Sequence, residues 1–155
     1  MFREIRKKER EISLEEAKKI IDENNYGVLS TINVDNGYPY GIPLSYSYVN
    51  DEIYFHSAVE GLKVEAFGRD SRVCFTVIGR TEILPDKFST KYESAIIYGK
   101  ILELTEKEKE EALFELIKKY SADFLEEGKK YIERSGARTK VFKIKIEHIS
   151  GKARR

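Results

Sequence analysis

Bulky and small residues alternate most clearly between residues 40 and 48. The bulky positions are Tyr40, Ile42, Leu44, Tyr46 and Tyr48, and the small ones between them are Gly41, Pro43, Ser45 and Ser47. A period of two places successive side chains on opposite faces of a β-strand. The segment therefore predicts a strand with one bulky face and one small face. Pro43 has no backbone N–H to donate, which favours an edge strand, a bulge or a position that faces a ligand.

Five further segments have the composition and alternation of β-strands. They cover residues 27–33, 53–56, 72–78, 94–104 and 142–148. Asp35-Asn36-Gly37 and Asn50-Asp51 are turn signals, so neighbouring strands should pair as hairpins. In the last segment His148 has the same phase as Phe142, Ile144 and Ile146, which predicts a partly buried histidine. Residues 82–90, which contain Pro85, are predicted to be irregular.

Two capping boxes mark helix starts. Ser13 with Glu16 and Thr105 with Glu108 both fit the pattern in which a hydroxyl and a carboxylate cap the first turn. An apolar stripe follows each box, with Leu14, Ala17, Ile20 and Ile21 in the first and Leu113, Leu116, Ile117 and Tyr120 in the second. The first helix should end at Asn24-Asn25. Further helices are predicted over residues 59–68 and 122–134.

These elements predict a mainly β protein, a six-stranded antiparallel barrel with peripheral helices. Barrel closure is favoured because it removes exposed strand edges. No repeat or linker divides the chain, so residues 1–155 are expected to form one domain. Residues 1–12 are charged with alternating sign and are expected to be an N-terminal arm, either solvated or packed on a partner subunit.

Composition excludes several classes of function. The chain has 28 Lys and Arg against 27 Asp and Glu, which lacks the basic excess of a nucleic-acid binder. One Cys and two His exclude an internal disulfide and a zinc site built from several cysteines, and no metal site is expected. No apolar run approaches the roughly 18 residues that span a membrane. Together with the unpaired thiol of Cys74, this predicts a soluble, cytoplasmic protein.

The segment from Tyr54 to Lys63 is the densest cluster of candidate chemistry. A predicted strand ends at His56 and Ser57, a loop with Gly61 follows, and Lys63 lies in the first turn of a predicted helix. Free N–H groups at a helix start, together with a hydroxyl and an ammonium group, can bind a phosphate. The alternative is an ordinary strand, loop and helix with an exposed lysine.

Several segments resemble the flavin-binding split-barrel superfamily of pyridoxamine 5′-phosphate oxidase, and within it the nitroimidazole-resistance protein family. The resemblance rests on the order and spacing of motifs along nearly the whole chain. They are Arg6–Ile12, Gly37-Tyr38-Pro39-Tyr40-Gly41-Ile42-Pro43-Leu44, Ile53–Ala58, Gly61-Leu62-Lys63, Arg72-Val73-Cys74-Phe75, Tyr92–Lys100 and Ile149–Arg154.

The resemblance implies a homodimer with FMN at the subunit interface. It places Pro43, Leu44 and Ser45 beside the polar edge of the flavin ring, and it makes Ser94 a polar flavin contact. It places the phosphate at His56, Ser57, Gly61, Leu62 and Lys63. The oxidases carry Arg where this chain has Leu62, and they have a Trp that is missing here. Oxidation of pyridoxamine phosphate is therefore disfavoured.

The implied function is an FMN-dependent oxidoreductase that reduces a small molecule, with a nitro-aromatic compound as one candidate substrate. His56 is the candidate catalytic residue, and Lys152 is a further candidate near the flavin or the partner. The main alternative is a flavin-binding or sensing module without turnover. A pyridoxamine phosphate oxidase-like enzyme, a barrel for haem or a deazaflavin, and a barrel without cofactor also stay open.

Overall fold

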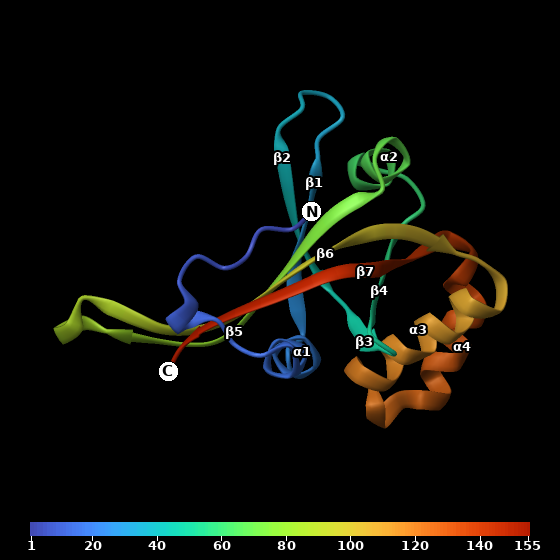
Figure 1. Cartoon of the computed structure of the whole chain (residues 1–155). Helices are drawn as coiled ribbons and strands as arrows, with labels where there is room; N and C mark the ends of the chain where they lie inside the picture. Colours follow the sequence, from blue (N-terminus) through green and yellow to red (C-terminus); the bar gives the residue numbers. More distant parts are fainter.

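The computed structural model describes residues 1–155, and its centre is a single antiparallel sheet of seven strands (Figure 1). The spatial order is β2-β1-β5-β6-β7-β4-β3. The strands are β1 (Tyr26–Ile32), β2 (Pro39–Ser45), β3 (Ser47–Val49), β4 (Glu52–Ala58), β5 (Arg72–Leu84), β6 (Ser89–Leu104) and β7 (Thr139–Arg154). The mainly β antiparallel architecture is confirmed, with seven strands in place of six.

The extra strand arises because the predicted segment 40–48 is interrupted at Tyr46. β2 and β3 lie at opposite edges of the sheet, yet only Tyr46 separates them in the chain. The two edges of the sheet must therefore approach each other at this residue, which curls the sheet into a split barrel. The edge position of β2 also accommodates Pro43, as predicted.

Four α-helices surround the barrel. They are α1 (Leu14–Glu23), α2 (Leu62–Arg69), α3 (Glu106–Tyr120) and α4 (Leu125–Ser135). α1 packs against β5, β6 and β7, and α2 packs against β1. α3 packs against β3 and β4 and pairs with α4, so these two helices form a lobe on one side of the barrel (Figure 1). No helix of the chain combines the length and apolar character needed to span a bilayer.

The barrel interior is filled by one face of each long strand and by α1. Its fully buried side chains include Ile21, Leu29, Tyr46, Phe55, Phe75 and Ile97. The capping box at Ser13 is present, because the Glu16 amide donates to the Ser13 hydroxyl and the Ser13 amide donates to the Glu16 carboxylate. Ala17, Ile20 and Ile21 of the predicted stripe are buried in the core, whereas Leu14 is exposed.

The prediction that residues 82–90 are irregular is wrong. β5 continues to Leu84 and β6 begins at Ser89, and the two strands pair through Leu84 and Ser89. The resulting hairpin extends away from the barrel (Figure 1). Because both of its faces are largely exposed, its sequence lacks the apolar alternation of a buried strand. Pro85 begins a short 3-10 turn at the tip, where its fixed φ is favourable.

The predicted phase of His148 is also wrong. Tyr98 pairs with His148, whereas the next residue, Gly99, pairs with Ile146. Glu147 is therefore an extra residue in β7, and a β-bulge of this kind reverses the alternation of faces. As a result Ile149 faces the core, and His148 lies on the outer face beside Tyr98.

The second capping box is absent. Thr105 precedes α3, but its side chain makes no capping hydrogen bond. Glu106 has a φ of 53°, in the left-handed region, so the first residue of α3 lacks the helical backbone of a regular capped helix. The helix itself is present and has Ala112 and Leu116 buried.

Candidate functional site

The end of β4 and the start of α2 bring together five residues predicted from the sequence. His56 and Ser57 lie at the end of β4. Gly61 is the N-cap of α2, with a φ of 135° that only glycine adopts readily. Leu62 and Lys63 form the first turn of α2. No side chain caps this turn, so its N–H groups and the Lys63 ammonium are available to an anion.

His56 lies on the outer face of β4, because its neighbour Phe55 is fully buried in the barrel. Although His56 is exposed on one side, partial burial lowers the pKa of its imidazole, and the positive charge of Lys63 lowers the pKa further. The neutral form of the imidazole is therefore favoured at pH 7. It has one N–H donor and one nitrogen acceptor to offer a ligand.

Ser57 has a different environment from the rest of this group. Its side chain is buried, and its hydroxyl donates a 2.8 Å hydrogen bond to the Ala58 carbonyl. The hydroxyl can donate to a phosphate oxygen only if it gives up its hydrogen bond to the Ala58 carbonyl. The structure thus presents Lys63 and the α2 amides as the open anion donors.

The second group of predicted residues lies on β2 and β6. Pro43 and Ser45 are on the exposed face of β2, and Leu44 points inward and packs against the core. A row of paired residues crosses the outer face of the sheet at the level of Pro43. In order it contains Pro43, Val28, Thr76, Ile96 and Ser150.

Ser94 lies on this same outer face, two residues before Ile96. It pairs with Ile78 on one side and with Lys152 on the other. Lys152 also forms an isolated β-bridge with Glu11 of the N-terminal arm. The structure therefore places Pro43, Ser45, Ser94 and Lys152 on one continuous surface. No hydrogen bond or ion pair of the single chain joins this surface to the His56 and Lys63 group.

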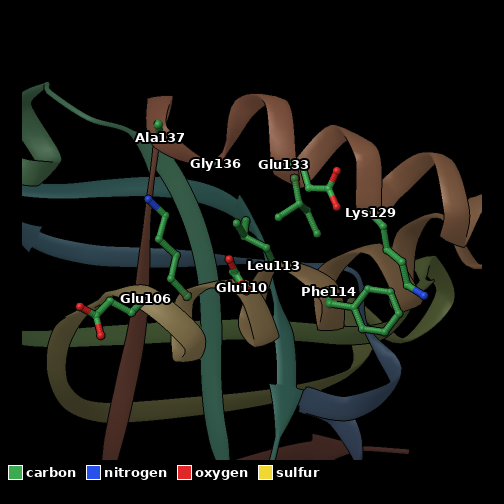
Figure 2. Close-up of a pocket in the computed structure, with 10 residues that line it drawn as sticks. Glu106, Glu110, Leu113, Phe114, Lys129, Glu133, Gly136 and Ala137 are labelled. Atoms are coloured by element: carbon green, nitrogen blue, oxygen red, sulfur yellow. The ribbon is translucent and has the colours of Figure 1, made fainter.

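Two cavities lie under and between α3 and α4. A groove of about 460 Å³ runs between the two helices, with Leu113 and Phe114 among its lining residues (Figure 2). None of the predicted site residues lines it. A smaller cavity of about 80 Å³ is lined by His56 together with Leu113, Leu116 and Tyr131. His56 thus faces an apolar cavity, and this explains the burial that lowers its pKa.

Sequence reasoning missed two residues that contact the end of β2. The Tyr46 amide donates a 2.9 Å hydrogen bond to the Tyr120 hydroxyl, and the Lys119 ammonium donates one of 2.9 Å to the Tyr46 carbonyl. The sequence pattern places Tyr120 in an apolar stripe, yet its hydroxyl makes these polar contacts. Because these partners are more than 70 positions apart in the chain, no local pattern could have found them.

Comparison with known proteins identifies the family. The model of the pyridoxamine 5′-phosphate oxidase family matches residues 13–153. No curated protein gives a significant match.

Solved structures with the same fold cover most of the chain. A candidate 5-nitroimidazole antibiotic resistance protein from Bacteroides thetaiotaomicron is 26% identical, with a TM-score of 0.79 over 92% of this chain and 86% of that one. An FAD-binding protein from Mesorhizobium loti is 25% identical, with a TM-score of 0.65 over 94% of this chain and 98% of that one. An FAD and heme binding protein from Mycobacterium smegmatis is 18% identical, with a TM-score of 0.79 over 91% and 71%.

The seven-stranded barrel, its split between β2 and β3, and the family match over nearly the whole chain agree with one another. The chain belongs to the pyridoxamine 5′-phosphate oxidase family and has its split-barrel fold.

Proposed function

We propose that this protein binds FMN as a homodimer and uses it to reduce a small organic molecule. The observation that carries the proposal is the uncapped first turn of α2, with Lys63 in it and His56 beside it. It supplies backbone N–H groups, a positive charge and a neutral imidazole. This set of donors fits a phosphomonoester, which is the charged group of FMN.

The edge strand β2 suits the polar rim of the flavin ring. β1 pairs with only one side of β2, so alternate N–H and C=O groups of β2 point away from the sheet without strand partners. Gly41, Pro43 and Ser45 have small side chains, so a flat ring system can lie against the exposed face of β2. Backbone groups near Pro43, Leu44 and Ser45 can then bind the ring, and Ser94 adds a hydroxyl on the same outer face.

The dimer proposal rests on the outer face of β1, β5 and β6, on which the N-terminal arm covers only the end at Tyr98. Four large apolar side chains are exposed on it, Tyr26, Ile32, Ile78 and Tyr98, with exposed fractions of 68%, 51%, 58% and 39%. Exposed apolar surface of this extent typically marks an interaction site. A partner on this face would cover it and would bring a second set of site residues near Ser94 and Lys152.

Bound FMN would supply two-electron redox chemistry, and the protein would supply orientation and charge. Lys63 and the α2 amides would fix the phosphate, and β2 would orient the ring. His56, whose neutral form is favoured at pH 7, can hydrogen bond to a ligand and accept or donate a proton. The apolar cavity beside it would cover one side of the imidazole.

The substrate class follows from the relative named for 5-nitroimidazole resistance. Reduction of a nitro group to a nitroso group takes up two electrons and two protons and releases water. A reduced nicotinamide would supply the electrons. We include a cytoplasmic location in the proposal, because the single thiol of Cys74 is unpaired and suits a reducing compartment.

The test is anaerobic turnover by the FMN-loaded protein with a reduced nicotinamide and a nitro-aromatic compound. The proposal predicts that the nitro compound is consumed at least about tenfold faster than with the same concentration of free FMN, which corresponds to about 1.4 kcal/mol of barrier lowering. If the protein binds FMN but gives only the rate of free FMN, the flavin-binding module without turnover becomes the correct description.

FAD is the second candidate cofactor, because two of the similar structures are named as FAD-binding proteins. Competition between equal concentrations of FMN and FAD decides between the two. The proposal predicts preferential retention of FMN. Preferential retention of FAD would assign the protein to the FAD-binding relatives.

A further inference from the structure

The β2–β3 junction at Tyr46 needs hydrogen-bond partners from outside the sheet. Tyr46 lies between two strands at opposite sheet edges, so its backbone N–H and C=O belong to neither ladder. The residue is nevertheless fully buried. Buried backbone groups without partners are strongly unfavourable, and the last two residues of α3 supply those partners.

The Tyr120 hydroxyl and the Lys119 ammonium each hydrogen bond to one backbone group of Tyr46. Tyr46 N–H donates to the Tyr120 hydroxyl at 2.9 Å. Lys119 donates to the Tyr46 carbonyl at 2.9 Å and to the Asn24 carbonyl at 2.6 Å. The Tyr120 hydroxyl also contacts the carbonyls of Tyr46 and Asn25. A hydroxyl has a single hydrogen to donate. Tyr120 can therefore donate to the Asn25 carbonyl, while Lys119 donates to the Tyr46 carbonyl.

These contacts come directly after Ser45, the last residue of β2. Burial raises the pKa of the Tyr120 phenol, and the hydrogen bond with the Tyr46 backbone acts in the opposite direction. The Lys119 ammonium lies 4.1 Å from the centroid of the Tyr46 ring, a cation–π contact that holds the ammonium over the junction. The end of β2 is thus fixed by α3, and its ladder with β1 ends at this point.

We propose that Lys119 and Tyr120 are positioning residues for flavin binding, because they hold the Leu44 and Ser45 end of β2 in the conformation that binds the ring. This inference rests on the proposed function. It assigns to the α3–α4 lobe a role beyond packing, since a helix outside the barrel determines the geometry of the flavin strand. Neither residue would touch the flavin itself.

The test uses two conservative variants with matched controls. Tyr120→Phe removes only the hydroxyl, and Lys119→Met removes the ammonium and keeps the length of the side chain. Lys118→Met is the control for Lys119, because Lys118 is exposed and pairs with Glu115 at 2.6 Å on the same helix. Tyr38→Phe is the control for Tyr120, because Tyr38 is exposed between β1 and β2 and its hydroxyl makes no hydrogen bond.

The first readout does not need the cofactor. Hydrogen exchange of the Leu44, Ser45 and Tyr46 amides in the free protein should become about tenfold faster in both variants. The core of β6 and both controls should show no change. Equal exchange at the three amides in variants and parent would overturn the inference whether or not the protein binds FMN.

The second readout is the FMN dissociation constant and the visible spectrum of bound FMN. Both variants should bind FMN about five- to tenfold more weakly with a shifted flavin spectrum, and Lys119→Arg should recover most of the affinity. Folded variants with the parent dissociation constant and spectrum would show a merely structural role and overturn the inference. If Tyr120→Phe does not fold, the comparison of Lys119→Met with Lys119→Arg decides the question.

Failure of the parent protein to bind FMN is a separate result. It would overturn the proposed function and the flavin part of this inference together. Unchanged FMN binding in the variants of a parent that does bind FMN would overturn this inference alone.

Discussion

The aromatic ring of Phe2 lies flat on the imidazole of His148, with ring centroids 4.7 Å apart and 7° between the planes. The contact exists because the bulge at Glu147 brings His148 to the outer face of β7, beside Tyr98. Phe2 also stacks on Tyr98 at 5.1 Å. The N-terminal arm therefore covers one end of the surface on which we propose that the partner subunit binds.

Gly99, which pairs with β7 at this bulge, should tolerate no side chain. A Cβ at Gly99 would overlap the Lys145 carbonyl oxygen and come within 2.8 Å of a methyl carbon of Ile144. We expect Gly99→Ala to lower the free energy of unfolding by about 2 kcal/mol, measured by urea denaturation.

Gly68→Ala is the matched control. No atom would lie within 4 Å of its Cβ, and Gly68 is in α2, so alanine there should stabilise the protein by about 0.5 to 1 kcal/mol. Equal stability of Gly99→Ala and the parent would show that the bulge is not tightly packed.

Features that depend on neighbouring residues are predictable from the sequence, and features that depend on strand register or distant partners are not. Ser13 and Glu16 were identified correctly because a capping box involves residues three apart. The phase of His148 was wrong because a β-bulge depends on the register between β6 and β7, which no single strand encodes. The strand break at Tyr46 was missed because its partners, Lys119 and Tyr120, come from a distant helix.

The candidate site was predictable to the extent that it is local. His56, Gly61 and Lys63 lie within a single strand, loop and helix, so their spacing alone indicated an anion site. Side chains alternate along this strand, so Phe55 is buried and His56 lies on the outer face. The shared outer face of Pro43 and Ser94 depends on pairing across β1, β5 and β6, and only the resemblance to a family suggested that these residues act together.

Lys63→Ala should weaken FMN binding. The substitution removes the positive charge in the first turn of α2, and charge-assisted hydrogen bonds of this kind contribute about 1.5–3 kcal/mol. The dissociation constant measured by quenching of flavin fluorescence should therefore rise about 10- to 100-fold. Lys107→Ala is the control, because Lys107 is exposed on α3 and pairs only with Glu111. An unchanged dissociation constant for Lys63→Ala would show that the FMN phosphate does not bind at the first turn of α2.

The imidazole of His56 should titrate below the ordinary value of 6.5 in the protein without FMN. Burial and the charge of Lys63 disfavour its protonated form, so Lys63→Ala should raise the pKa. NMR titration of the imidazole protons measures both values. A His56 pKa at or above the ordinary value would contradict the burial of the imidazole against the α3–α4 lobe.

The same pKa shift predicts how His56 affects stability. The unfolded chain binds the His56 proton more readily than the folded protein does, so the free energy of unfolding should fall as the pH drops from about 7 through the folded pKa. His56→Gln should remove this part of the pH dependence. Identical pH profiles for His56→Gln and the parent would contradict the prediction.

Ile78→Glu should dissociate the proposed dimer. Ile78 pairs with Ser94 on the exposed outer face, and a carboxylate buried there between two subunits would be strongly unfavourable. Sedimentation should show a dimer for the parent and a monomer with weakened FMN binding for the variant. Phe124→Glu, at an exposed apolar residue beside α4, should stay dimeric. A parent monomer that binds FMN with full affinity would place the flavin site within one chain.

The absorbance spectrum of the purified protein after incubation with FMN and removal of the free cofactor tests the central claim most directly. The account predicts visible flavin bands, one FMN per chain, and release of unmodified FMN on denaturation, identified by chromatography. A protein that stays colourless after this treatment, with either FMN or FAD, would contradict the proposal that this split barrel is a flavoprotein.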